Sequence, residues 1–474
     1  MSDRDIAGPP VAGNGALAGR RLVLLMAVSA NLFGNLNFSG VNVVAPAIEA
    51  ELGLSATGIV WLTLSCMLLM AAVSAPVARL ADILGRRRLT ILGVWVAIVG
   101  FLGGALAPDP WTLFASRALT GVGLSTFFTT SMTMIAASYP KEERGRVFGL
   151  AIGAVYVSLS VGPVIAGAFS QAFGWRPLFG FWALMLVPTL ALAYMVEKEP
   201  PVAKGESLDW KGVPLWAFGV TLFFAGLASL TTQRTALAVA ALVAGALLIA
   251  AFVWRGSRSE SPLLDLSLFT ESRRFSLSSL AAYVSYVSSF SIALLMSLYF
   301  QYSKGLSPFY AGLALVVQPL VQAALTPLAG RLSDRHDPGL IASLGLSVIL
   351  CGMLFFVFSL GGSTPVWVDL IPMSLCGAGF ALFSAPNSNA IMSAVPPPRL
   401  GQASGVITIT RLSGQLSSMA LTSMVFALVI GPGEITPDKY PSFIKAARIL
   451  FLAFSPLCVL AIFASLARGR PKAS

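Results

Sequence analysis

Residues 53–88 read GLSATGIVWLTLSCMLLMAAVSAPVARLADILGRRR, an apolar run of about 21 residues between a Gly-Leu-Ser turn and a basic loop. Crossing the hydrocarbon core of a bilayer as a helix takes about 20 such residues, because lipid offers no partners to free backbone groups. The arginines that follow the run are typical of a loop held on one side of a membrane. This stretch therefore predicts one membrane span with a short loop at each end.

Apolar runs of the same kind recur along the whole chain. The first of them follows Arg20 and Arg21, as in a signal peptide, but it is too long and has no cleavage site, so we expect an uncleaved first span. Fourteen spans are predicted, and an even number places both chain ends on one side. They cover residues 22–48, 57–77, 89–107, 111–137, 147–173, 177–196, 212–231, 236–254, 276–300, 308–329, 339–360, 366–394, 403–430 and 443–467.

The composition requires nearly the whole chain to lie in lipid. Of its 474 residues, 56% are hydrophobic and 11% are charged, and the mean hydropathy is +0.81, whereas a soluble domain carries about 25% charged residues. The net charge of +11 lies in short clusters between apolar runs, so nucleic acid is not an expected partner. The four cysteines lie far apart inside apolar runs and His336 is the only histidine, which argues against a disulfide framework and against a metal site.

The distribution of Lys and Arg predicts which side the loops face. With the N-terminus in the cytoplasm, the cytoplasmic segments hold 23 of the 31 basic residues and the external segments hold six. Because basic loops stay in the cytoplasm, both termini are predicted to be cytoplasmic. Arg117 and Arg411 lie within spans.

An offset of 252 residues superposes one half of the chain on the other. It places residues 53–55 (GLS) on residues 305–307 (GLS), and Arg79 and Asp82 on Arg331 and Asp334. One register thus matches an external loop and a cytoplasmic loop at once. The two halves are predicted to be parallel duplicates, as is common in transporters, with spans seven and eight inserted between them.

Short motifs occur in a fixed order on this frame. They are residues 78–88 (ARLADILGRRR) with a degenerate copy at 330–335 (GRLSDR), 117–123 (RALTGVG), 162–167 (GPVIAG), 208–212 (LDWKG), 299–301 (YFQ), 305–308 (GLSP) and 311–312 (AG). Together they resemble the motifs of the major facilitator superfamily, in particular its fourteen-span drug:proton antiporter branch. Ala78, Thr120 and Ala166 depart from that pattern, which has glycine, glutamine and glycine there.

The resemblance implies a cytoplasmic gate and a hinge. In the gate, Asp82 and Arg79 with their copies would hold the two halves together at the cytoplasmic side, although a merely solvated basic loop is the alternative. The predicted gate residues are Arg79, Asp82, Gly85, Arg86, Arg331 and Asp334. The hinge, or a plain structural kink, would lie at Gly162, Pro163 and Gly167, where a Cβ and a backbone donor are missing.

Polar residues inside the spans predict a substrate cavity. Ionisable and amide side chains are costly in hydrocarbon, so they should face a bundle interior or water, either as a binding site or as bonds between helices. The predicted cavity residues are Asn35, Asn37, Asn42, Arg117, Thr120, Tyr283, Tyr286, Gln318, Gln322, Asn387, Asn389 and Arg411.

One acidic residue expected from the resemblance is absent. Members of the branch carry an aspartate in the first span for proton or cation coupling, and the alignment puts Asn37 there. No acid falls near the middle of a predicted span, and Asp369 comes closest. Transport would then be coupled to protons or cations through another acid, such as Asp369, or would not be coupled at all. With two arginines in spans and no opposing carboxylate, the cavity should favour neutral, zwitterionic or anionic substrates over lipophilic cations.

The sequence therefore predicts an all-α polytopic membrane protein with a major facilitator fold. Residues 1–196 and 276–474 would form two six-helix bundles, joined by a linker with two inserted spans at residues 197–275. We expect a monomeric secondary active transporter of the inner or plasma membrane, without cofactor or metal, whose partners are the bilayer, a small-molecule substrate and protons. It would export small amphipathic compounds by alternating access, driven by an ion gradient.

Other functions are less well supported. Within transport, the alternative is an uptake or facilitated carrier for a neutral or anionic metabolite without proton coupling. An enzyme would need convergent His, Asp or Glu at the membrane surface, a sensor would bring a sizeable soluble domain, and an ATP-driven pump would carry a Walker A motif.

Overall fold

The computed structural model of the chain describes residues 14–197, 209–231, 235–258, 263, 267–396 and 399–468, and the regular elements within these ranges are helical. Thirteen helices of this part are long and apolar enough to cross a membrane, which confirms the predicted all-α polytopic fold. The seventh predicted span is a shorter helix of 17 residues, Gly212–Ala228. At ~1.5 Å per residue it is about 26 Å long, slightly less than a ~30 Å hydrocarbon core.

Each predicted span corresponds to one helix or to a broken helix. The sixth, ninth and tenth spans are each built from two helices, and the ninth also ends in a π-helical turn. In chain order the elements are α1 (Asn14–Leu52), α2 (Ala56–Leu84), α3 (Arg86–Ala105), α4 (Pro110–Ser138), α5 (Lys141–Phe173), α6 (Trp175–Met185), α7 (Val187–Met195), α8 (Gly212–Ala228), α9 (Thr235–Gly256), α10 (Ser267–Glu271), α11 (Arg273–Ser289), α12 (Ile292–Leu298), η1 (Tyr299–Ser303), α13 (Pro308–Leu315), α14 (Val317–Arg335), α15 (Pro338–Ser359), α16 (Val366–Met392), α17 (Leu400–Val429), η3 (Pro437–Lys439) and α18 (Tyr440–Ala467).

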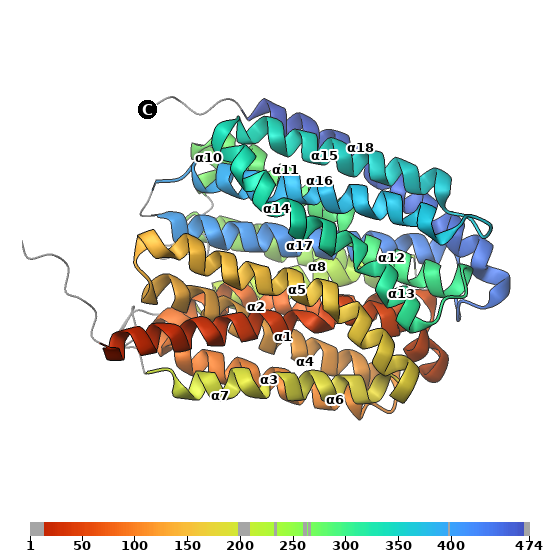
Figure 1. Ribbon diagram of the computed structural model, residues 1–474, viewed down its shortest axis with the longest axis horizontal. Coiled ribbons are helices and arrows are strands. Elements are labelled where there is room, and N and C mark those ends of the chain that lie inside the picture. Colours follow the sequence, from red (N-terminus) through yellow and green to blue (C-terminus); the bar gives the residue numbers. More distant parts are fainter. Residues whose placement is uncertain are drawn as a thin grey trace, which may run out of the picture.

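The helices form two bundles with the same arrangement of neighbours (Figure 1). In the first bundle α1 packs on α5, α3 on α4 and α2 on α4; in the second α11 packs on α17, α15 on α16 and α14 on α16. The inserted helices α8 and α9 pair with each other, and α8 also lies against α2 and α17, one helix from each bundle. The start of α1 and the end of α18 lie on the same side of the molecule (Figure 1).

The molecule has two opposite ends with different loops. We call the side that carries residues 53–55 and 305–307 the Gly-Leu-Ser end, and the side that carries residues 85–88 the arginine-rich end. The turns of the Gly-Leu-Ser end have the same backbone, because Gly53 and Gly305 both have a φ of 65°, a value that favours glycine. The predicted offset of 252 residues is therefore also present in the structure.

Close glycine contacts between helices follow the same offset. A Cβ at Gly121 would collide with the carbonyl oxygen of Cys66, and a Cβ at Gly377 would collide with that of Gln318. Cys66 and Gln318 are 252 residues apart, whereas the two glycines are 256 apart. Two of the four extra residues lie in α15, which is longer than α3, and two lie in the linker before α16, which is longer than the linker before α4. Each half thus packs its second and fourth spans at the same glycine, as small residues in membrane helices allow.

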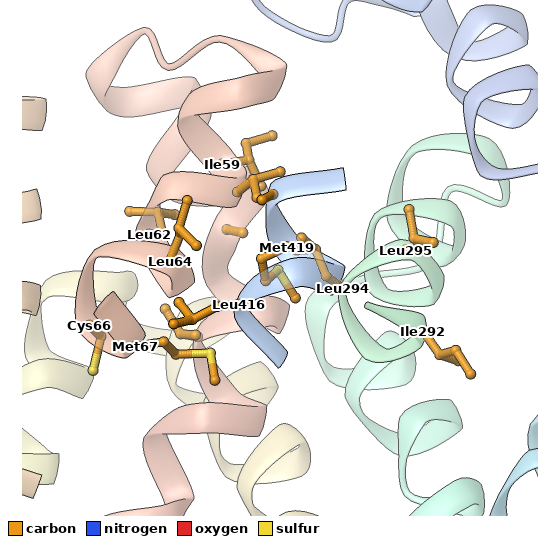
Figure 2. Packing of buried hydrophobic residues seen from close by; sticks show 14 of the residues in the cluster. Ile59, Leu62, Leu64, Cys66, Met67, Ile292, Leu294, Leu295, Leu416 and Met419 are labelled. Atoms are coloured by element: carbon orange, nitrogen blue, oxygen red, sulfur yellow. The ribbon is translucent and has the colours of Figure 1, made fainter. Parts of the chain in front are cut away.

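The bundles meet along two unlike contacts. Helix α5 approaches α13 very closely, since a Cβ at Gly312 would collide with the carbonyl oxygen of Pro163, and one at Gly167 with that of Pro308. Helix α2 meets α17 through large apolar side chains instead. Figure 2 shows Leu416 and Met419 of α17 beside the labelled residues of α2, Ile59 to Met67. We call the whole boundary between α1–α7 and α11–α18 the seam.

Candidate functional site

The buried charge of the first bundle is Arg117 on α4. This side chain is fully buried, with 0% exposure. Its Nε donates to the carbonyl oxygen of Leu62 at 3.0 Å and its Nη1 donates to Oδ1 of Asn37 at 2.9 Å, while Nη2 has no hydrogen-bond partner among the described residues. The groups that hold the guanidinium are therefore a carbonyl and an amide, both neutral.

The start of α4 fixes where Arg117 lies. Asp109 caps the helix, because its carboxylate accepts hydrogen bonds from the backbone N–H groups of Trp111 and Thr112, and Pro110 occupies the first helical position. The hydrogen bonds from Thr112 hold the pKa of Asp109 below its usual value. Arg117 comes about two turns later and so points at the partner helices well inside the bundle.

Asn37 occupies the position on α1 where the sequence predicts a missing acid. It is fully buried, and its Nδ2 donates to the carbonyl oxygen of Gly34 at 2.7 Å, which leaves Oδ1 to accept from Arg117. This bond orients the amide oxygen toward the guanidinium. The charge of Arg117 consequently has no carboxylate in contact within the described part of the chain.

A second cationic group lies at the seam. Arg411 is exposed although it lies in the middle of α17. Tyr286 of α11 is within electrostatic range of both Arg411 and Tyr156 of α5, and its hydroxyl contacts Ser384. Since Tyr156 belongs to the first bundle, Tyr286 lies near the seam, and Arg411 is its cationic neighbour within the second bundle. Tyr286 also packs edge-on against a second ring, Phe380, with centroids 5.5 Å apart.

The other predicted cavity residues are divided among several places. Tyr283 hydrogen-bonds Ser417 at 2.7 Å, and Oδ1 of Asn42 accepts from Thr63 at 3.4 Å, so these two join helices of one bundle. Asn35 and Thr120 donate back to carbonyl oxygens of their own helices. Gln322 is buried, Gln318 is partly buried and Asn389 is exposed.

Asn387 lies near the arginine-rich end and away from this group. Its Oδ1 accepts from Arg468 at 2.9 Å and its Nδ2 donates to the carbonyl oxygen of Ser278 at 3.1 Å. Arg468 is itself buried, and that burial, together with nearby Arg274, lowers its pKa to about 10. The guanidinium joins α18 to α11, α15 and α16.

The predicted hinge residues lie on α5, which packs between α1 and α13. Gly162 packs against Ser39 and the carbonyl oxygen of Leu36, and Pro163 and Gly167 face α13. The predicted gate residues lie at the arginine-rich end. Asp82 accepts from Nη2 of Arg86 at 3.1 Å, one helical turn away, across Gly85, which ends α2 with a φ of 96°.

The remaining gate residues have separate environments. Arg79 is partly buried and takes part in a polar or electrostatic contact. Arg331 is exposed, and the side chain of Asp334 lies outside the described part of the chain. Arg87, which was not singled out, donates to the carbonyl oxygens of Ala193 and Tyr194 and so joins α3 to the end of α7.

Glu49 is a buried acid that the sequence did not predict as part of the site. The first span is predicted to end at residue 48, whereas α1 continues to Leu52 and buries this carboxylate to 4% exposure. Glu49 accepts hydrogen bonds from the hydroxyl of Tyr302 and, at 2.7 Å, from the backbone N–H of Ile435. Both donors belong to the second bundle or its connecting loop, so Glu49 crosses the seam at the Gly-Leu-Ser end.

Three further hydrogen bonds cross the seam beside Glu49. Ser297 donates to the carbonyl oxygen of Asn42 at 2.7 Å, and Nε2 of Gln301 donates to that of Val43 at 3.0 Å. The backbone N–H of Ala56 donates to the carbonyl oxygen of Gly433 at 3.3 Å. The Gly-Leu-Ser end of the molecule is therefore closed by polar contacts between the two bundles.

Two like bundles with buried arginine and polar contacts along their seam define a membrane carrier of the duplicated-bundle class. The chain matches the family model of the Major Facilitator Superfamily over residues 27–419 and 278–473. These matches cover most of the sequence, and the chain belongs to this family, which implies a transporter rather than an enzyme.

Several known proteins are similar to the chain. The riboflavin transporter RibZ of Clostridioides difficile (strain 630) is 25% identical over 443 residues, which are 93% of this chain and 96% of that protein. The multidrug resistance protein Stp of Mycobacterium tuberculosis (strain CDC 1551 / Oshkosh) is 28% identical over 390 residues, 82% of this chain and 72% of that protein. A bacterial homologue of the human lysosomal transporter Spinster has a similar fold, with a TM-score of 0.68 at 16% identity, covering 95% of this chain and 97% of that one.

Proposed function

We propose that the chain exports small amphipathic compounds by alternating access, in which the two bundles rock about a site at the seam. The duplicated bundles support this proposal, because two similar bodies in contact along one boundary can open it at either end. The polar contacts at the Gly-Leu-Ser end, from Glu49, Ser297 and Gln301, would break in one half of the cycle. The similarity to Stp, named for multidrug resistance, supports export.

We also propose that the Gly-Leu-Ser end faces the outside and that both termini are cytoplasmic. The asymmetry of basic residues supports this orientation. Asp82 and Arg86 would then belong to the cytoplasmic gate, whose ion pair at 3.1 Å is a contact within one bundle here.

The charge of the site supports a substrate class. Arg117 is buried against neutral Asn37, and Arg411 is within electrostatic range of Tyr286, which Tyr156 of the first bundle also approaches. A cation entering this space would meet two positive charges and, among the described central residues, no carboxylate. Neutral, zwitterionic or anionic compounds with an aromatic part are therefore the favoured substrates, since tyrosine and arginine bind rings and carboxylates.

The test is transport by purified protein in proteoliposomes with and without a pH gradient. A lipophilic cation, a neutral flavin and an aromatic carboxylate of similar size serve as probes, and Asn37→Asp is compared with the wild type. We expect flux of the neutral or anionic probes, stimulated by the gradient, and a gain of cation flux in Asn37→Asp. If the wild type transported only the cation, the proposed substrate class would be contradicted. If transport of the probes were the same with and without the pH gradient, coupling to that gradient would be contradicted.

A second candidate is a carrier for a neutral or anionic metabolite without proton coupling. Its support is the similarity to RibZ, named as a riboflavin transporter, which extends over 93% of the chain. The same proteoliposomes distinguish the two functions, because this carrier would equilibrate the flavin in either direction at equal pH and would not concentrate it when a gradient is applied.

A further inference from the structure

Glu49 is a carboxylate whose burial depends on the contact between the bundles. It lies on α1 in the first bundle, close to the end of that helix at Leu52. The two donors that reach it, Tyr302 and the backbone N–H of Ile435, both come from across the seam. If the Gly-Leu-Ser end opened, both donors would leave and water would replace them. The same group would then alternate between a dry and a wet environment in each cycle.

The charged groups around Glu49 do not neutralise it. Lys439 and Glu434 act on it from a distance, with opposite signs, and no ion pair joins Glu49 to a cation among the described residues. The ammonium of Lys439 is instead bonded to the carbonyl oxygens of Pro432 and Glu434. On η1, Tyr302 stacks on Tyr440 of α18. The hydrogen bonds from Tyr302 and Ile435 favour the charged form of this carboxylate, but the loss of water without a cation in contact disfavours that form more strongly.

A second buried acid near this end, Asp369, differs from Glu49 in one respect. Asp369 of α16 is fully buried, but its partner Lys304, at 3.9 Å, belongs to the same bundle. Burial lowers the pKa of Lys304, which lies just outside the ninth span, while Asp369 opposes that shift. When the bundles rock, Asp369 and Lys304 move together. The environment of this pair therefore does not change when the seam opens or closes.

We propose that Glu49 is a proton-binding site that controls the gate at the Gly-Leu-Ser end. The inference rests on the proposed alternating access and orientation. In the open gate the carboxylate is hydrated and charged. On closure it takes one proton from the outside solution onto a carboxylate oxygen and, as a neutral acid, contacts Tyr302 and Ile435. Reopening returns that proton to the same solution. Acidic surroundings therefore favour the closed gate.

The direction of the effect follows from linkage. A protein state that binds a proton more tightly gains population as the pH falls, and one linked proton changes the ratio of states by at most about tenfold per pH unit. The closed state seen here is the one that buries Glu49. Replacement by glutamine keeps the shape and a polar oxygen but removes the titration, so Glu49→Gln should remain closed at every pH.

Spin-label distances measure the gate without any substrate. Leu106 and Phe358 are exposed, lie on opposite bundles at the Gly-Leu-Ser end and are 252 residues apart. Leu106→Cys and Phe358→Cys would be labelled in full-length protein in lipid nanodiscs, with exposed Cys351 changed to Ser. Between about pH 8 and about pH 5.5, we expect the long-distance population of the otherwise wild-type protein to fall several-fold, and Glu49→Gln to stay short throughout. Asp369→Asn is the matched control and should keep the wild-type response.

Three outcomes would overturn the inference: no response to pH, a response that survives in Glu49→Gln, or a response lost equally in Asp369→Asn. If Glu49→Gln does not fold, Gln301→Glu remains as a second test, since it should add a titrating group at the equivalent place in the other half. The proposed function is judged separately. If the protein transports a probe but its gate does not respond to pH, only the proton site at Glu49 is contradicted. If the gate responds to pH but no probe is transported, the proposed transport function is contradicted and the proton site is retained.

Discussion

Glu49 and Gln301 occupy the same place in the two halves of the chain, 252 residues apart, and each reaches across the seam to the opposite bundle. Gln301 donates to the carbonyl oxygen of Val43 at 3.0 Å, while Glu49 accepts from the N–H of Ile435 at 2.7 Å. The duplicated fold thus makes two reciprocal contacts at one end. Only Glu49 carries a group that can titrate. The two halves thus have equivalent backbone positions here but chemically different side chains.

The first prediction is that Gln301→Glu makes the gate more sensitive to pH. The introduced carboxylate, when charged, would face the carbonyl oxygen of Val43, which repels it, so closure would require its protonation as well. With two linked protons the ratio of open to closed states should change by up to about a hundredfold per pH unit. The spin-label distances between positions 106 and 358 measure this slope. Gln301→Leu removes the hydrogen bond without adding an acid and should leave the wild-type slope; an equal slope in Gln301→Glu would contradict the prediction.

The second prediction concerns the buried charge of Arg117. Asn37→Asp places a carboxylate against Nη1, at a distance that is 2.9 Å for the present amide oxygen. Because the guanidinium is already out of water, an added counter-charge should stabilise the protein by on the order of 2 kcal/mol. Thermal unfolding in detergent measures it. Asn35→Asp, which lies half-buried without an arginine partner, is the control and should destabilise. A lower melting temperature for Asn37→Asp would show that Arg117 does not need an opposite charge.

The architecture could be predicted from the sequence because lipid imposes a strong and local constraint. Every apolar run of sufficient length became a helix, and the Gly-Leu-Ser turns at Gly53 and Gly305 marked the repeat, since both need the same unusual φ. The pairing of Asn37 with Arg117 is different. Both were predicted as cavity residues, but they are 80 residues apart in the chain and lie on different helices. Hydropathy does not determine how a helix is rotated about its axis, so it could not predict their hydrogen bond.

Glu49 could not be found in this way for a physical reason. Hydropathy ends a span where polar residues begin, whereas α1 continues past residue 48 and places Glu49, but not the exposed Glu51, against the second bundle. The donors Tyr302 and Ile435 come from segments more than 250 residues away. The 252-residue offset was the one available signal, since it places Glu49 on Gln301 in the segment that begins with Tyr299.

The third prediction assigns a structural role to Asp209 in the segment before α8. Its Oδ1 accepts from Nη2 of Arg255 at 2.7 Å and from the N–H of Gly212 at 3.0 Å. Burial alone would raise the pKa of Asp209, but these hydrogen bonds outweigh it and hold the pKa below its usual value. The stabilisation is therefore present above about pH 4 and is lost as the pH falls through the lowered pKa.

Asp209→Asn should accordingly lower the melting temperature by a few degrees at neutral pH. Measured against pH, the difference from the wild type should vanish in acid, where Asp209 is protonated. Transport should be unchanged, because Asp209 lies at the end of α8 and its bonds reach Arg255 of α9 and Gly212 of α8, not the two bundles. A loss of flux without a loss of stability would instead place this segment in the transport cycle.

The fourth prediction tests the orientation. Exposed positions Arg88 and Arg335 belong to the end expected in the cytoplasm, and exposed Leu106 belongs to the opposite end. With Cys351 changed to Ser, an impermeant thiol reagent applied to intact cells should label Leu106→Cys. Arg88→Cys and Arg335→Cys should be labelled only after permeabilisation. Labelling of positions 88 and 335 from opposite sides would contradict not only the orientation but also the parallel duplication.

The last prediction tests whether the close contact between α5 and α13 holds the Gly-Leu-Ser end shut. Gly312 faces the carbonyl oxygen of Pro163 so closely that a single methyl group must push the helices apart. Gly312→Ala should therefore destabilise the closed state by about 1–3 kcal/mol, the usual effect of overpacking. The long-distance population between positions 106 and 358 should rise in proportion. Gly330→Ala on α14 is the matched control, because a Cβ there meets nothing within 4 Å, and it should leave the distances unchanged. If both variants behave alike, the α5–α13 contact does not control the gate, and the closure must then depend on other contacts of the seam, among them the polar bonds of Glu49, Ser297 and Gln301.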